Sequence, residues 1–228
     1  MTPVPYVDIH THPSHYETDA ITVQNIYPGD GFAAFSGRNF YSVGLHPWHI
    51  GTEEENNEAL QLMEEALEFD HVIFVGEAGL DKSCGKDFAE QSRVFEAQAF
   101  IAEEYQYPLI IHCVKAYNEV IALRKKMKPS MTWILHGYTA GLEMTKQLAE
   151  MDFMFSFGDI LFRDNAKTIE SFQYLPLNRI FLETDEMDGE VEQIYNRAAA
   201  HKQIPVEELK TSVWKNFNRI EKTLSGRY

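Results

Sequence analysis

The sequence predicts one α/β domain of the TIM-type (β/α)8 barrel class, extending over residues 1–228. Short apolar runs alternate with longer segments of helical periodicity, which is the pattern of βα units around a parallel sheet. There are eight such runs, the number of strands that closes a barrel. The 228 residues are close to the roughly 250 of a typical barrel. An open doubly wound sheet is the alternative, but no glycine-rich nucleotide fingerprint follows the first run to favour it.

The elements follow in order along the chain. We expect strands at Val4–Ile9, Ala20–Ile26, Phe40–Leu45, Val72–Val75, Leu109–Ile111, Thr132–Leu135, Phe153–Phe157 and Arg179–Leu182. We expect helices near Glu53–Phe69, Asp87–Tyr105, Tyr117–Met127, Leu142–Met151, Arg163–Tyr174, Glu190–His201 and Val206–Leu224. The segment Pro13–Asn39 is rich in glycine and turn residues. The barrel is therefore expected to be somewhat shortened, with weak or missing helices after the first two strands.

Composition limits the partners and the location. The 35 acidic and 20 basic residues give a net charge of −15, so phosphate chemistry would depend on bound cations or a local basic patch. No apolar run approaches the roughly 20 residues of a membrane span, and Pro3-Val4-Pro5 leaves no room for a signal peptide. Cys84 and Cys113 lack a CxxC partner and are expected to be free thiols. We therefore expect a cytoplasmic protein without a membrane partner.

The first strand carries a polar set on one face. Side chains alternate along a strand, so Asp8, His10 and His12 point the same way, opposite to Val7 and Ile9. Two imidazoles spaced in this way can hold one metal ion. Asp8 is expected either to orient His10 or to anchor the barrel interior.

Four further residues follow apolar runs: Glu77, His112, His136 and Asp185. In a parallel barrel these positions are expected at the C-terminal rim, where active sites lie. Imidazole suits zinc, whereas carboxylates also accept manganese or magnesium, so the set predicts two divalent ions without deciding which. Glu77 is the natural bridge between them, and Asp185 could both bind a metal and take a proton from water.

Other residues are candidates for substrate contact. His46 lies at the end of the third strand and is expected to contact either the substrate or other residues of the rim. Glu183 lies two residues before Asp185, on the same face of the strand, and is expected either to support the site or to fill the barrel core. Lys115 could add a local phosphate contact. The densest basic cluster, Arg124, Lys125, Lys126 and Lys128, lies late in a helix, where cations are favoured for electrostatic reasons. We therefore expect a small phosphate substrate or a nucleic-acid end, rather than long duplex DNA, and nothing predicts a protein partner.

Taken in order, these motifs resemble those of the TatD-related metal-dependent hydrolases, often described as deoxyribonucleases. The resemblance extends from about Val7 to Ile220. The matching segments are Asp8-Ile9-His10-Thr11-His12, Gly44-Leu45-His46-Pro47, Gly76-Glu77-Ala78-Gly79-Leu80-Asp81, Pro108-Leu109-Ile110-Ile111-His112, Glu183-Thr184-Asp185, and Asn216 with Arg219.

The resemblance implies a two-metal phosphodiesterase. One ion would be held by His10, His12, Glu77 and Asp185, and the other by Glu77, His112 and His136, with His46 near the substrate phosphate. The chain departs from the family at Val114, where an arginine is usual, and in the segments Gly137-Tyr138-Thr139 and Glu186-Met187-Asp188-Gly189. Two alternatives remain open: an amide, ester or lactone hydrolase with the same metals, and a metal-binding barrel without turnover.

Overall fold

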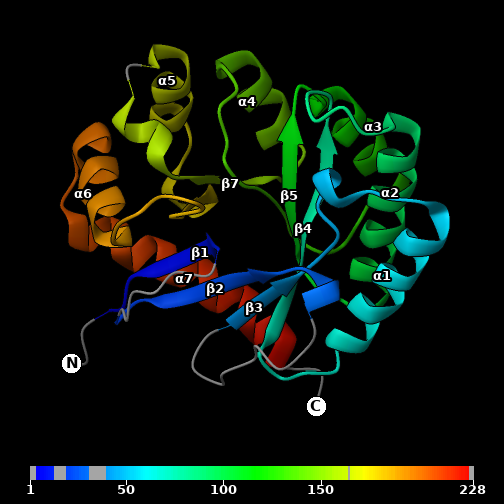
Figure 1. The fold of residues 1–228 in the computed structure, drawn as a ribbon. Coiled ribbons are helices and arrows are strands. Elements are labelled where there is room, and N and C mark those ends of the chain that lie inside the picture. Colours follow the sequence, from blue (N-terminus) through cyan, green and yellow to red (C-terminus); the bar gives the residue numbers. More distant parts are fainter. Residues whose placement is uncertain (1–3, 13–18, 31–39, 164, 226–228) are drawn as a thin grey trace. The chain divides into compact units, whose positions relative to one another are not determined.

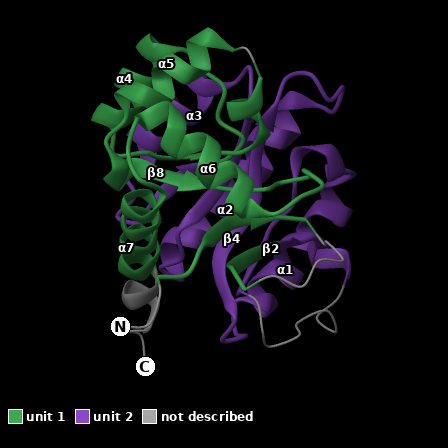
Figure 2. Ribbon diagram, turned by 90° about the vertical axis from the view of Figure 1, so that its left-hand side faces the viewer, with its two compact units in different colours: residues 1–24, 136–228 green, residues 25–135 purple. Residues whose placement is uncertain are grey.

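The protein is described from a computed structural model that covers residues 4–12, 19–30, 40–163 and 165–225. It consists of two compact units (Figure 2). Unit 1 comprises residues 1–24 and 136–228, and unit 2 comprises residues 25–135. The prediction of a single domain stays a prediction. None of the helices in the described ranges is long and apolar enough to span a membrane.

The eight strands follow one another in the sheet in sequence order, β1 to β8. Figure 1 labels β1 to β5 and β7. They are β1 (Val7–Thr11), β2 (Ile21–Ile26), β3 (Phe40–Val43), β4 (Val72–Asp81), β5 (Leu109–Val114), β6 (Trp133–Leu135), β7 (Met154–Phe157) and β8 (Ile180–Leu182). The boundary between the units falls within β2, after Gln24, and again directly after β6. All eight predicted strands are therefore present.

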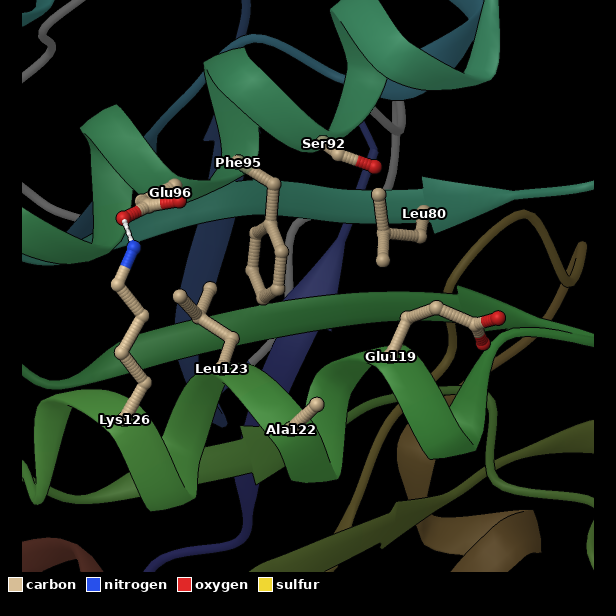
Figure 3. A pocket seen from close by; sticks show the side chains of 8 residues that line it. All are labelled: Leu80, Ser92, Phe95, Glu96, Glu119, Ala122, Leu123 and Lys126. Carbon is tan, nitrogen blue, oxygen red and sulfur yellow. Dashed lines mark hydrogen bonds and ion pairs between the residues drawn. The ribbon is translucent and has the colours of Figure 1, made fainter.

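Unit 2 contains the parallel strands β3 to β6 and the helices α1 (Glu53–Ala66), α2 (Phe88–Glu104) and α3 (Tyr117–Met127). Short 3-10 turns lie at η1 (Pro28–Asp30) and η3 (Pro47–His49). Helix α1 begins at a capping box, in which Thr52 and Glu55 satisfy each other's backbone N–H groups. Its apolar stripe is buried, as at Leu60 and Met63. Between α2 and α3 lies a small cavity of about 220 Å³, and the ring of Phe95 points from α2 into it (Figure 3).

Strand β4 differs most from its prediction. It was expected to end at Val75, but it continues through Glu77 to Asp81. Val75 pairs with Leu109 and Ala78 with Ile111, so β4 contains one extra residue at this point, a β-bulge. The sequence suggested an end here because glycines usually interrupt strands.

Glycines are needed in this part of β4 because the neighbouring backbone is close. A Cβ atom at Gly79 would lie 1.9 Å from the carbonyl oxygen of His112, and one at Gly76 would lie 2.4 Å from that of Ile110. Both glycines also have positive φ angles, of 156° and 128°. The bulge places Glu77 within the strand and turns its N–H toward Asn25, whose side-chain oxygen accepts it at 2.7 Å.

Unit 1 contains β1, the first part of β2, β7 and β8. Its helices are α4 (Leu142–Glu150), α5 (Ala166–Tyr174), α6 (Val191–Lys202) and α7 (Val206–Ser225), with 3-10 turns at η4 (Asp159–Phe162) and η5 (Leu177–Arg179). The buried face of α7 carries Leu209, Val213, Phe217 and Ile220 at helical spacing. From the same helix, Asn216 donates to the carbonyl oxygens of Leu177 and Ile180, both at 2.9 Å. The asparagine of the C-terminal motif thus holds the start of β8.

All seven predicted helices are present, and α3 has the predicted bounds. The described residues between β1 and β3 contain no α-helix, only η1, in agreement with the prediction of weak or missing helices there. Residues 13–18 and 31–39 of that region lie outside the described residues.

Candidate metal centre

In unit 1, His10, His12, His136 and Asp185 form one group. Oδ1 of Asp185 lies 3.7 Å from Nε2 of His10 and 3.5 Å from Nε2 of His12. The rings of His10 and His136 are 4.3 Å apart, and His10, His136 and Asp185 each offer a ligand atom within 4.8 Å of the others. His10 is fully buried, whereas the side chains of His12 and Asp185 are 36% and 39% exposed.

Backbone pairing brings these residues together. The N–H of Asp185 donates to the carbonyl oxygen of His10 at 3.0 Å, and the N–H of His12 donates to that of Asp185 at 3.2 Å. A parallel β-bridge joins Thr11, the last residue of β1, to Asp185, and so extends the parallel pairing beyond the end of β8. Asp185 has a φ of 54°, a left-handed conformation that an aspartate tolerates better than most residues. Sequence parity therefore placed the two histidines on one face, and the bridge brings the aspartate to them.

Asp8 supports this bridge through Thr184, the residue before Asp185. Its carboxylate accepts the N–H of Thr184 at 3.0 Å and the Thr184 hydroxyl at 2.6 Å. Burial raises the pKa of Asp8 to about 7, although the hydrogen bonds from Thr184 act in the opposite direction. Of the two roles expected for Asp8, the contacts favour the anchor.

Glu183 is a buried carboxylate beside the group. Its Oε1 lies 3.7 Å from Nδ1 of His136 and accepts the N–H of Gly137. Burial alone would raise the pKa of Glu183, but His136, and more weakly the charge of His10, hold it below its ordinary value. A negative carboxylate here would fix the orientation of His136.

A cleft of about 410 Å³ opens beside the unit 1 group. Its lining residues are Gly137, Thr139, Gly158, Asp159, Ile160, Arg163, Glu183, Thr184, Asp185, Glu186 and Met187. The half-exposed Asp185 therefore faces space large enough for a small ligand, since binding pockets typically measure about 300–1,000 Å³.

In unit 2, Glu77 is held by two histidines. Its Oε1 lies 2.8 Å from Nδ1 of His112 and 3.1 Å from Nε2 of His46, and the two rings are 4.4 Å apart. These three residues also offer ligand atoms within 4.8 Å of one another.

The hydrogen bonds of His46 limit what it can do. Its Nδ1 accepts the backbone N–H of Trp48 at 3.1 Å. In the neutral ring the proton must then be on Nε2, which faces Glu77 and acts as a donor. A histidine in this tautomer cannot bind a metal through Nε2, so the contacts favour a donor role for His46.

Asp81 and Trp48 complete the unit 2 group, and no role was predicted for either residue. Oδ2 of Asp81 accepts the indole N–H of Trp48 at 2.7 Å and lies 3.6 Å from Nε2 of His112. Burial opposes ionisation of Asp81, but the N–H groups of Trp48 and Ser83 and the neighbouring His112 hold its pKa below the ordinary value. Asp81 lies four residues after Glu77 in β4, so the two side chains are expected on the same face of the strand. This alternation could have identified Asp81 from the sequence.

Each group fits a divalent metal by the chemistry of its donors. Imidazole nitrogens and carboxylate oxygens are the ligands of zinc and of several other divalent ions. Unit 1 supplies three imidazoles and Asp185, and unit 2 supplies Glu77 and His112.

Comparison with known families identifies the chain. The sequence model of the family described as "TatD related DNase" matches residues 31–222, which is most of the protein. The chain belongs to the TatD-related DNase family.

Two proteins with similar sequences are described as metal-dependent hydrolases. The chain is 28% identical over 180 residues to an uncharacterized metal-dependent hydrolase of Haemophilus influenzae, covering 75% of this chain and 66% of the relative. It is 29% identical over 149 residues to the uncharacterized metal-dependent hydrolase YabD of Bacillus subtilis, covering 64% of this chain and 58% of YabD. The matched part of the TatD-family chain thus spans less than two thirds of the length of either relative.

A solved structure with the same fold is that of YjjV, a TatD homologue from Escherichia coli K12. The TM-score is 0.81 at 19% identity, and the match covers 94% of this chain and 97% of YjjV. At this identity the likeness concerns the fold alone, and it confirms the predicted TIM-type barrel of parallel strands with helices between them.

The predicted site residues of this TatD-family chain fall into the two groups. Unit 1 brings together His10, His12, His136 and Asp185, and unit 2 brings together His46, Glu77 and His112. A bridge by Glu77 between two ions stays a prediction. Lys115 follows β5 with a φ of 56° and an exposed side chain. Its role in substrate binding also stays a prediction.

Proposed function

We propose that this chain is a metal-dependent hydrolase that cleaves phosphate esters. The observation that carries the proposal is the unit 1 group, in which His10 and His12 share one oxygen of Asp185 beside a cleft of about 410 Å³. Family membership and the names of the relatives support metal dependence and hydrolysis.

We propose two ions, one at each group, of zinc, manganese or magnesium. Such ions would polarise the phosphoryl oxygen and lower the pKa of water toward neutrality. In unit 1, the histidines would bind the ion through Nε2 of His10 and His12, while Glu183 fixes the ring of His136. In unit 2, Glu77 and His112 would be the ligands.

Asp185 is the proposed general base. Its side chain is 39% exposed and lines the cleft, so a water molecule can reach it. Its backbone N–H and carbonyl group are hydrogen-bonded to His10 and His12, which keeps the carboxylate in place when the proton is transferred. Glu77 is the second proposed catalytic residue, and the Nε2–H of His46 would donate to Glu77 or to a substrate oxygen.

The proposed substrate is a small phosphate ester or a nucleic-acid end. The net charge of −15 disfavours long duplexes, whose binding depends on many Lys and Arg contacts. The basic cluster of α3 is largely engaged within the protein. Lys126 pairs with Glu96 of α2 (Figure 3), and the guanidinium of Arg124 lies 5.3 Å from the ring centre of Trp133. Lys128 ends the helix.

The test is a substrate panel with manganese, zinc or magnesium added to metal-free protein. The panel contains a phosphomonoester, a dinucleotide, a short single strand, a long duplex, an amide and a lactone. Asp185→Asn should keep the fold and lower kcat by about 10²–10⁴-fold, the usual value of general-base catalysis. Asp152→Asn, which changes an exposed carboxylate elsewhere in unit 1, is the control and should leave kcat unchanged.

Each alternative function predicts a different result in this substrate panel. Turnover of the amide or lactone without turnover of any phosphate ester would replace the proposal with the amidohydrolase alternative. Full metal occupancy without turnover of any substrate would favour a metal-binding barrel. A clear preference for the long duplex would contradict the proposed substrate class.

A further inference from the structure

The cleft of unit 1 is strongly acidic. Four of its lining residues are carboxylates: Asp159, Glu183, Asp185 and Glu186. Arg163 is the one cation among the described residues that line it. An anionic substrate in this cleft therefore depends on metal charge and on Arg163.

The guanidinium of Arg163 forms an exposed ion pair, which a phosphate group could replace. One terminal nitrogen of its guanidinium contacts Oδ2 of Asp159, four residues earlier in the chain. The side chains are 66% and 49% exposed, so solvent screens the pair and weakens it. A phosphate group offers two oxygens to the planar guanidinium, and such paired, charge-assisted hydrogen bonds are stronger.

The position of Arg163 distinguishes it from an ordinary surface ion pair. Unit 1 contains a second pair of the same chemistry, Arg179 with Asp152, but neither of those residues lines the cleft. Arg163 lines the same cleft as Asp185, so one small ligand can reach both side chains.

We propose that Arg163 leaves Asp159 to bind the phosphate of the substrate, and that it determines the preference of the cleft for phosphate esters. This inference rests on the proposed function and names the residue that would recognise its substrate. Asp159 then acts as a competitor that holds the guanidinium at the cleft until phosphate arrives.

The experiment measures steady-state hydrolysis of a dinucleotide and calorimetric binding of inorganic phosphate, both with metal-loaded protein. Arg163→Gln should raise KM and the Kd for phosphate by about 10- to 100-fold, the typical range for a hydrogen bond to a charged group, with a smaller change in kcat. Arg163→Lys should recover part of the loss, because lysine keeps the charge but not the paired geometry. Asp159→Asn should lower KM by up to about fivefold, the usual scale of an exposed ion pair.

Arg179→Gln is the matched control and should leave KM, kcat and phosphate binding unchanged. Metal content and thermal unfolding are measured for every variant, and Arg163→Lys serves as the main variant if Arg163→Gln is unfolded. Normal turnover with equal KM in the Arg163 variants and Arg179→Gln would overturn this inference and leave the proposed function standing. Failure of the wild type to hydrolyse any phosphate ester would overturn both.

Discussion

The ligand groups of the two units use similar side chains but hold them at different distances. In unit 1, the nitrogens of His10 and His12 lie 3.7 and 3.5 Å from the oxygen of Asp185 that they share. In unit 2, the nitrogens of His112 and His46 lie 2.8 and 3.1 Å from the oxygen of Glu77 that they share. The two nitrogen–oxygen distances in unit 1 are longer than a hydrogen bond, whereas the two in unit 2 are within hydrogen-bond length.

This difference bears on metal affinity. An ion with tetrahedral bonds of about 2.0–2.2 Å spaces its ligand atoms about 3.3–3.6 Å apart. The unit 1 atoms are already near that spacing, whereas an ion in unit 2 must replace existing hydrogen bonds. We therefore expect unit 1 to be the tighter metal site.

The two groups also differ in what fixes them. Backbone hydrogen bonds position Asp185 in unit 1. The unit 2 group is instead supported by side chains: the indole N–H of Trp48 donates to Asp81, and the amide oxygen of Asn25 accepts the N–H of Glu77. The support of unit 2 can therefore be changed by single substitutions that leave the metal ligands in place. The three predictions that follow test this comparison, from the largest expected effect to the smallest.

The largest effect is expected from ligand removal. His10→Ala should abolish the tighter of the two metal-binding phases and lower activity by more than about 100-fold, beyond the range typical of supporting residues. His112→Ala should remove the weaker phase and leave the tighter one. Titration against a competing chelator, with elemental analysis, measures both phases. Loss of the tighter phase in His112→Ala would reverse the ranking of the two sites.

A smaller effect is expected at Trp48. Trp48→Phe keeps an aromatic ring but removes the N–H that donates to Asp81, so metal affinity of the unit 2 group should fall by about 10-fold. The unit 1 phase should not change. Trp214→Phe, a matched substitution in α7 of unit 1, should alter neither phase. Equal behaviour of the two variants would show that the indole hydrogen bond does not support the metal site.

The smallest effect concerns pH, measured on chelator-treated protein. The pKa of Asp8 is raised to about 7, so its contribution to stability is present below pH 4 and is lost as pH rises through 7. The pKa of Asp81 is lowered, so its contribution is present above pH 4 and is lost as pH falls further.

Asp8→Asn should therefore flatten the fall in melting temperature between pH 4 and 7, and Asp81→Asn should flatten the fall below pH 4. Thermal unfolding across pH 2–8 checks both. A common pH profile for the two variants would contradict the opposite pKa directions.

Much of this arrangement could be predicted from the sequence. The alternation of side chains along the first strand identified His10 and His12 as neighbours on one face. Helical periodicity predicted both ends of α3 correctly. The end of β4 could not be predicted, because Gly76 and Gly79 look like strand breakers until the close backbone of β5 is known. The link between Trp48 and Asp81 was also missed, since it joins residues 33 positions apart and depends on tertiary structure.

The bridge between β1 and Asp185 has a consequence for the newly made chain. Asp8 and Thr184, which hold it together, are 176 residues apart, whereas Glu77 and His112 are separated by 35. At a synthesis rate of about 5–20 residues per second, the ribosome takes roughly 9–35 s after His10 to reach its partner aspartate. On the ribosome, the ligands of unit 2 are therefore complete first, and those of unit 1, the site expected to be tighter, are complete last.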